Sequence, residues 1–175
     1  MTTLRVGKCY RNFTRPYTRK SKVKSKSYIK AVPQNKVVRY DMGDLTKKFE
    51  YSVNLISNQN IQLRHNALES ARLVVNRRLT DKLGPKGFFM KLRVYPHHVL
   101  RENKMLSGAR ADRLQTGMSH SFGKPIGLAA QVKKNSIVFS INVDKISLET
   151  AKEAIKTAIP RLPGKFTVNV EKVSS

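Results

Sequence analysis

The spacing of apolar residues differs between segments of the chain, and each kind of spacing predicts a different element. Some short segments alternate apolar and polar residues or are rich in β-branched residues, which is typical of strands with one buried face. We expect such strands at residues 37–40, 51–56, 88–95, 127–132, 137–143 and 166–170. Between residues 61 and 83 apolar residues recur every three, four or seven positions, which predicts a long amphipathic helix.

Polar and helix-breaking residues mark the expected ends of two helices. Ser57 or Asn58 can cap the start of the first helix, and Gly84 with Pro85 is expected to end it. A second helix is predicted from near Ser147 to around Pro160, because proline lacks the backbone donor and clashes with the preceding turn. The pattern indicates an α+β fold, and no internal repeat or long linker divides it.

Composition agrees with one folded domain that carries an unusual charge. Leu, Ile, Val and Phe together make up 47 of the 175 residues, and the net charge is +24. Because the apolar share exceeds the ~20% level below which highly charged chains are expected to be disordered, we expect a folded body. So large a positive charge excludes most ordinary soluble enzymes and predicts a polyanionic partner.

The positive charge is concentrated in two segments. Residues 1–39 contain 12 Lys and Arg and no acidic residue, and residues 84–134 contain 10 basic against 2 acidic residues. We therefore divide the chain into a basic N-terminal arm, residues 1–36, and an α+β RNA-binding body, residues 37–175. Aromatic residues interleave the basic residues of the arm, so it offers phosphate contacts beside rings that stack on bases.

Basic residues of the arm and of the strand after the first helix are the expected RNA contacts. The residues that we expect to neutralise RNA phosphates are Arg5, Lys8, Arg11, Arg15, Arg19, Lys20, Lys22, Lys24, Lys26, Lys86, Lys91 and Arg93. A long segment at about residues 101–126 is rich in Gly and Arg and has no clear period, and loops of this length are usually functional or disordered. We interpret it as an extension that reaches into a nucleic-acid cavity, or alternatively as a solvated surface loop.

Several other classes of protein are disfavoured by the sequence. The longest uncharged segment, residues 51–63, is too short to span a membrane, and no secretory signal precedes the body. The single cysteine, Cys9, allows no internal disulfide and no zinc site, so we expect a cytoplasmic protein without metal or other cofactor. A buried or RNA-shielded thiol is the expected state of Cys9.

A series of motifs in fixed order resembles one protein family. The motifs are His97-His98-Val99, Asn103-Lys104-Met105-Leu106, ADRLQTGM at residues 111–118, FGKP at residues 122–125 and then Gly127. Gly7-Lys8-Cys9-Tyr10-Arg11 near the start, Glu69-x-Ala71-Arg72 and Pro163-Gly164 extend the likeness over most of the chain. The sequence resembles the large-subunit ribosomal protein ten-e of archaea and eukaryotes, the homologue of bacterial large-subunit protein sixteen.

This resemblance implies an α/β-hammerhead-like fold with two helices on a mixed sheet. It further implies a place in the large ribosomal subunit, on ribosomal RNA (rRNA) near the peptidyl-transferase centre and beside other ribosomal proteins. The long loop of the family points toward tRNA, so the residues expected to face tRNA are Arg101, Lys104, Arg110, Arg113, Gln115 and Lys124. The chain has no extension of the eukaryotic kind, which favours an archaeal origin.

Catalysis is the weakest alternative. His97 and His98 are near Asp112 in sequence, but adjacent strand residues point to opposite faces and no Ser or Cys nucleophile motif accompanies them. We therefore expect no enzymatic activity. A DNA-compacting basic protein and a ribosome-assembly or RNA-modifying factor stay open as alternatives, because both also bind polyanions through high positive charge.

Overall fold

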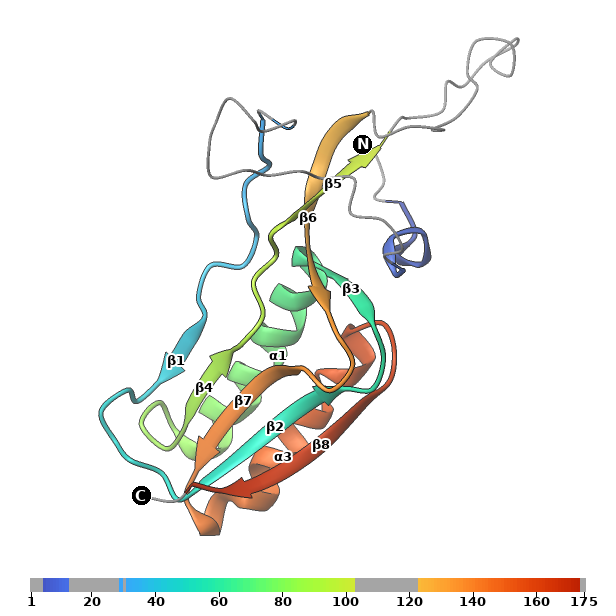
Figure 1. Cartoon of the computed structure of the whole chain (residues 1–175). Helices are drawn as coiled ribbons and strands as arrows, with labels where there is room; N and C mark the ends of the chain where they lie inside the picture. Colours follow the sequence, from blue (N-terminus) through green and yellow to red (C-terminus); the bar gives the residue numbers. More distant parts are fainter. Residues whose placement is uncertain (1–4, 13–28, 30, 103–122, 174–175) are drawn as a thin grey trace, which may run out of the picture.

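The computed structural model describes residues 5–12, 29, 31–102 and 123–173, which form two sheets and two α-helices (Figure 1). The five-stranded sheet has the order β1 (Asp41–Gly43), β4 (Phe89–Leu92), β7 (Ile137–Val143), β2 (Tyr51–Ser57) and β8 (Phe166–Lys172). The three-stranded sheet has the order β3 (Ile61–Arg64), β6 (Lys124–Val132) and β5 (His98–Glu102). The helices are α1 (His65–Leu83) and α3 (Leu148–Lys156), and short 3-10 turns occur at Gly7–Tyr10, Lys145–Ser147 and Ile159–Arg161.

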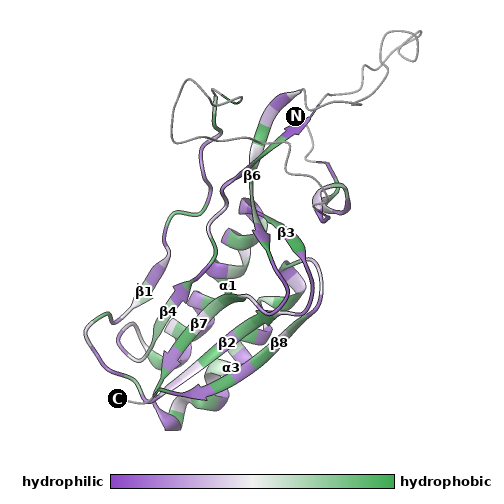
Figure 2. Ribbon diagram, viewed as in Figure 1, coloured by the Kyte–Doolittle hydropathy of each residue, from purple (hydrophilic) through white to green (hydrophobic). Residues whose placement is uncertain are grey.

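The register of the five-stranded sheet separates an apolar face from a polar face. Residues that pair across neighbouring antiparallel strands share a face. One row of paired residues is entirely apolar and consists of Met42, Met90, Ile141, Val53 and Val170. The next row is polar, lies on the opposite face, and consists of Asp41, Lys91, Ser140, Asn54 and Asn169. Figure 2 shows the corresponding alternation of hydrophobic and hydrophilic residues along β8.

Both helices pack against the apolar face of this sheet, on the same side in Figure 1. The stripe of α1 that is fully buried consists of Leu68, Ala71, Val75 and Leu79, and α3 buries Ala151, Ala154 and Ile155. Burying one large aliphatic side chain contributes roughly 1.5–3 kcal/mol, so this layer accounts for most of the apolar stabilisation. No other described helix or strand lies over the polar face, which the viewer sees in Figure 1.

The three-stranded sheet extends from one end of the larger sheet and carries the N-terminal segment (Figure 1). Strand β3 follows β2 after a turn at residues 58–60 and pairs with β6 from Ile61 opposite Val132 to Arg64 opposite Ala129. Beyond that point β6 pairs with β5, where a small separate cluster of Ile29, Val99 and Leu128 is buried. Basic segments from both halves of the chain therefore meet at this end.

The expected α+β class with two helices is confirmed, and β2, β7 and β8 form where alternation predicted them. In place of one mixed sheet, the described strands form two antiparallel sheets. The expected start of the first helix is wrong, because Ile61 and Leu63 are buried as alternate residues of β3. The helix begins at His65 without a side-chain cap, so neither Ser57 nor Asn58 caps it, while Gly84 with φ of 73° ends it as expected.

Three further boundaries differ from the expected pattern. The strand expected at residues 37–40 forms at Asp41–Gly43, because the side chain of Val38 is exposed and does not join the core. The strand expected at residues 88–95 ends at Leu92, and β5 begins after Pro96, which has no backbone donor for a strand ladder. Helix α3 follows Ser147 as expected but ends at Lys156, and Pro160 lies in the next 3-10 turn.

Candidate nucleic-acid interface

The N-terminal segment, residues 5–12, is anchored on β3 by its backbone. The backbone N–H of Gln62 donates to the carbonyl oxygen of Arg11 at 2.8 Å, and its side-chain Nε2 donates to the carbonyl oxygen of Tyr10 at 2.9 Å. The first bond joins the backbone of β3 to a neighbour that is not itself a strand, and the side-chain bond adds a second tie to the same segment. Because they engage only carbonyl groups, the side chains of Lys8 and Arg11 stay exposed.

Arg64 makes the second anchor of this segment. Its Nη1 donates to the carbonyl oxygen of Arg5 at 3.1 Å, and its guanidinium carbon lies 5.5 Å from the centre of the Tyr10 ring. A Cβ at Gly7 would lie 3.1 Å from Nη2 of Arg64, so the absence of a side chain there lets the guanidinium approach the 3-10 turn. Burial, followed by the nearby Glu102 carboxylate, raises the pKa of Tyr10, which keeps this ring neutral.

The expected tRNA-facing loop begins and ends on adjacent strands beside this segment. Glu102 at the end of β5 pairs with Lys124 at the start of β6, and Arg101 pairs with Pro125. Arg101 is half-buried, Lys124 is exposed, and Arg5 approaches Glu102 with 3.9 Å between Nη1 and Oε1. The strands thus extend into the segment expected as loop, residues 101–126. The other expected tRNA-facing residues, which are Lys104, Arg110, Arg113 and Gln115, lie outside the described residues.

The expected rRNA contacts divide into separate groups. Arg5, Lys8 and Arg11 gather at the three-stranded sheet, whereas Lys91 and Arg93 lie on the polar face of the five-stranded sheet and Lys86 precedes β4. Lys91 forms an ion pair with Asp41 at 3.5 Å, and Nε of Arg93 donates to the hydroxyl of Ser140 at 3.0 Å. The remaining arm residues, Arg15, Arg19, Lys20, Lys22, Lys24 and Lys26, lie outside the described residues.

A group of aromatic rings next to the edge of the five-stranded sheet was not predicted from the sequence. The rings of Tyr40 and Tyr95 stack with their centres 5.4 Å apart, and the His97 ring lies 4.5 Å from that of Tyr95. Tyr95 is 48% exposed, whereas Tyr40 packs against the core cluster, so the group joins the core to the surface. Nδ2 of Asn35 donates to the Tyr40 hydroxyl at 2.7 Å and fixes its position. In the sequence, only the close spacing of the ring-bearing residues Tyr95, His97 and His98 could have indicated this group.

The histidines do not assemble a catalytic or metal site among the described residues. His65 is buried, and its Nδ1 accepts a long hydrogen bond of 3.4 Å from the backbone N–H of Lys36. Burial lowers the pKa of His65 and of His98, which favours neutral imidazoles. Asp112 lies outside the described residues, and no three His, Cys, Asp or Glu side chains meet within residues 5–12, 29, 31–102 and 123–173.

Cys9 is exposed in the anchored segment, so the expectation of a buried thiol is wrong, and shielding by RNA stays a prediction. Neither described helix combines the length and apolar character that a bilayer crossing requires.

Comparison with known proteins decides the family. Residues 14–169 match the family model described as ribosomal protein L16p/L10e. The chain belongs to the L16p/L10e family of ribosomal proteins. This confirms the family indicated by the sequence motifs, and it gives the chain a structural role in the ribosome.

Curated L16p/L10e relatives align over nearly their whole length. The large ribosomal subunit protein uL16 of Staphylothermus marinus is 47% identical over 161 residues, which cover 91% of this chain and 89% of the relative. The protein of the same name from Metallosphaera sedula is 47% identical, with 91% and 90% covered. That of Methanococcus aeolicus is 46% identical, with 97% and 95% covered. These relatives are archaeal, in agreement with the expected origin.

Proposed function

We propose that this protein is a structural component of the large ribosomal subunit that binds rRNA and helps to position tRNA near the peptidyl-transferase centre. The observation that carries the proposal is the anchoring of residues 5–12 on β3, since Gln62 and Arg64 hold the backbone and leave Lys8 and Arg11 exposed. Cations on a fixed backbone lose less conformational entropy on binding phosphate than cations on a free chain. The names of the relatives support the large subunit as the site of assembly.

The contacts are divided between three parts of the chain. The arm, residues 1–36, neutralises rRNA phosphates, and Lys86, Lys91 and Arg93 of the body add contacts elsewhere on the RNA. The segment between Glu102 and Lys124 faces tRNA, because it leaves from two adjacent strands at the end of the molecule where the arm is anchored. Neighbouring ribosomal proteins complete its surroundings, and the role is structural rather than enzymatic.

Sedimentation of a cell extract at low and high salt tests the rRNA part of the proposal. We expect the protein to migrate with large subunits at moderate salt and to be released only by salt that strips ribosomal proteins, because phosphate contacts weaken steeply with salt. Migration only with immature particles would favour an assembly or RNA-modifying factor. Migration only with chromosomal DNA would favour a compacting protein.

Shortening the loop tests the tRNA part. Glu102 and Lys124 are cross-strand partners, so a two-residue Asn-Gly turn can replace residues 103–123 without changing the ladder. We expect normal assembly of large subunits and reduced tRNA binding by those subunits, measured by filter binding. A replacement of equal length by Gly and Ser controls for loop length. Unfolding of the shortened protein, or unchanged tRNA binding, would contradict the role assigned to this loop.

A further inference from the structure

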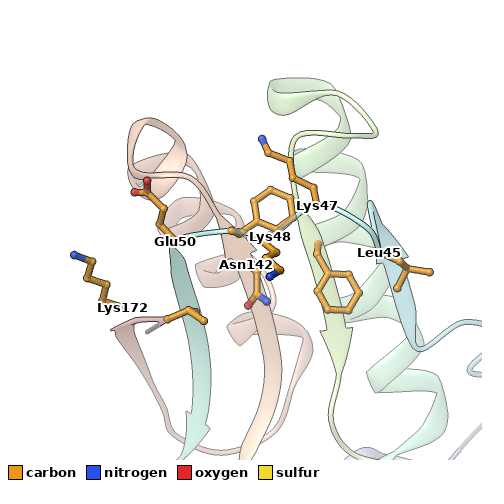
Figure 3. A pocket seen from close by; sticks show the side chains of 9 residues that line it. Leu45, Lys47, Lys48, Glu50, Asn142 and Lys172 are labelled. Atoms are coloured by element: carbon orange, nitrogen blue, oxygen red, sulfur yellow. The ribbon is translucent and has the colours of Figure 1, made fainter. Parts of the chain in front are cut away.

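The polar face of the five-stranded sheet ends in a pocket that the function proposed above does not use (Figure 3). The pocket has a volume of about 660 Å³, within the range of roughly 300–1,000 Å³ typical of small-molecule sites. Its lining residues are Leu45, Lys47, Lys48, Phe49, Glu50, Phe89, Asn142, Lys172 and Val173. Figure 3 shows that these residues come from the loop between β1 and β2, from β4 and β7, and from the end of β8.

The loop that forms one wall of the pocket is held in place at its start. Oδ1 of Asp44 accepts hydrogen bonds from the Thr46 backbone N–H at 2.8 Å and from the Thr46 hydroxyl at 2.7 Å. The backbone N–H of Asp44 donates to the carbonyl oxygen of Phe88 at 2.9 Å. Gly43 has φ of 89°, and a Cβ there would lie 2.1 Å from that oxygen, so this close approach requires glycine.

The rest of the loop is tied to two other elements. Nζ of Lys47 forms an ion pair with Asp144 at 2.6 Å and lies 5.0 Å from the centre of the Phe49 ring. The backbone N–H of Val173 donates to the carbonyl oxygen of Glu50 at 2.8 Å, which joins the end of β8 to the loop. The walls are therefore preorganised, which lowers the entropic cost of binding a ligand.

The lining combines aromatic rings, an amide and cations. Phe89 and Asn142 are cross-strand partners on β4 and β7, so the Phe89 ring and the Asn142 amide stand side by side on one face. The Asn142 side chain makes no hydrogen bond to the described residues, and within them no ion pair involves Lys48 or Lys172. The charge of Lys47 is paired with Asp144 and the Lys172 side chain points away from the rings in Figure 3, so Lys48 is the cation available beside Asn142.

We propose that this pocket binds an unpaired nucleotide of rRNA, with the base against Phe89 beside the largely buried Phe49 ring, the base edge at Asn142, and a flanking phosphate at Lys48. Aromatic rings accept the face of a base, an amide matches the donors and acceptors of a base edge, and lysines bind phosphate as point charges. An acidic protein segment would engage the lysines but would leave the ring faces and the amide acceptor unused. The inference rests on the proposed function, because it assumes that rRNA is the partner.

Photo-crosslinking of large subunits isolated from cells that produce the full chain tests the pocket directly. After irradiation at ultraviolet wavelengths and nuclease digestion, we expect a mononucleotide adduct on a peptide that contains Phe49 or Phe89. Adducts confined to other peptides, such as one within residues 5–12, would overturn the pocket while leaving the ribosomal role intact. Absence of the protein from large subunits would instead contradict the proposed function itself.

Variants at Phe89 give an independent readout in assembled subunits. Loss of base stacking on an aromatic ring weakens binding by about fivefold or more. We therefore expect Phe89→Leu to raise the chemical reactivity of one rRNA base at least about fivefold, and Phe89→Tyr to keep that base protected. Phe166→Leu is the matched control, because Phe166 is half-buried at the start of β8 on the apolar face. Equal reactivity of the base in the Phe89→Leu and Phe166→Leu subunits would overturn the proposal.

Lysine variants separate RNA from a protein occupant. For single-stranded RNA, each lost phosphate contact lowers the slope of log affinity against log salt by about 0.7. We expect that decrease for Lys48→Gln in binding of the full chain to isolated large-subunit rRNA, and no decrease for the control Lys156→Gln on α3, which lies on the other side of the sheet. A carbodiimide crosslink from Lys48 to a carboxylate of a neighbouring protein would overturn the proposed nucleotide and identify an acidic protein segment as the occupant instead.

Discussion

The five-stranded sheet has one face covered by two helices, whereas the far part of the three-stranded sheet, where β5 pairs with β6, buries only a small cluster. The first region contains nearly all fully buried side chains, and its strand β2 pairs along its whole length with β8. The second holds the anchored N-terminal segment and both ends of the expected tRNA-facing loop. Most of the folding free energy therefore comes from the first region, whereas the anchored segment and the loop ends lie in the second, so substitutions in the two regions are expected to have different consequences.

The largest difference is expected between core substitutions in the two regions. Phe139 in β7 is fully buried, so Phe139→Ala is expected to lower the free energy of unfolding by about 3–5 kcal/mol. Val99 in β5 is also buried, but it belongs to the small cluster. Val99→Ala removes only two carbons, so the free energy of unfolding is expected to fall by only about 0.8 kcal/mol for each carbon. Chemical denaturation of the purified protein measures both values. Equal losses would show that the two regions share one core.

The ion pair of Glu69 and Arg72 within α1, which faces the edge of the five-stranded sheet at Met42, is expected to give the next largest effect. Arg72 is buried, donates to both carboxylate oxygens of Glu69 at 2.5 and 2.9 Å, and contacts Sδ of Met42 at 3.0 Å. Glu69→Gln is expected to cost about 2 kcal/mol, less than the ~3–5 kcal/mol of a fully buried pair, because Glu69 is partly exposed.

This pair also predicts a pH dependence. The hydrogen bond from Arg72 holds the pKa of Glu69 below its ordinary value. A carboxylate with a lowered folded pKa contributes its full stability above the unfolded value of about 4.3, and the contribution is lost as pH falls through the lower folded pKa. Denaturation between neutral and acidic pH should therefore show a smaller loss for Glu69→Gln than for the original protein. Parallel curves would contradict this cause.

A smaller effect on stability, with a local effect on exposure, is expected from Gln62→Ala. The substitution removes the side-chain bond to Tyr10 but keeps the backbone bond to Arg11, so about 0.5–1.5 kcal/mol is expected to be lost. The anchored segment should open more often, and trypsin should cleave after Lys8 and Arg11 faster. Gln34→Ala, at an exposed position, is the control. Unchanged cleavage would show that the backbone bond to Arg11 and the contacts of Arg64 hold the segment without the Gln62 side chain.

The smallest effect is expected for an ion pair on the surface of the helix layer. Arg78 of α1 and Glu153 of α3 approach to 3.0 Å, but their side chains are 43% and 62% exposed. Exposed pairs contribute about 0–1 kcal/mol, so Glu153→Gln should change the free energy of unfolding by less than about 0.5 kcal/mol. A loss above 1 kcal/mol in the same denaturation assay would show that this pair orients the two helices.

The sequence predicted the parts of the fold that depend on local pattern. Strand β7 has the expected bounds, and the buried stripe of α1 has the expected spacing. Strand β3 was missed because Ile61 lies seven residues before Leu68 and so fits the helical spacing as well as a period of two, and only pairing with β6 decides between them. Strand β5 was missed because its residues adjoin the segment that resembled a loop.

The candidate interface was predicted by charge but not by its anchors. Lys8 and Arg11 stand out in the sequence as cations without acidic neighbours, whereas Gln62 and Arg64 look like ordinary polar positions of a helix. Their role depends on contacts across more than fifty residues, which no local pattern encodes. The same holds for the pocket at Phe49 and Phe89, whose walls come from four separate segments.

The pairing of Glu102 with Lys124 has a consequence for how this protein can change over generations. Paired residues of an antiparallel ladder stand about 5 Å apart, so the two ends of any segment that connects them are already held close together. Doubling the length of such a connection costs only about 0.6 kcal/mol of closure entropy. Insertions, deletions and substitutions at residues 103–122 should therefore change the free energy of folding little. Selection on this segment is then expected to act through its effect on translation.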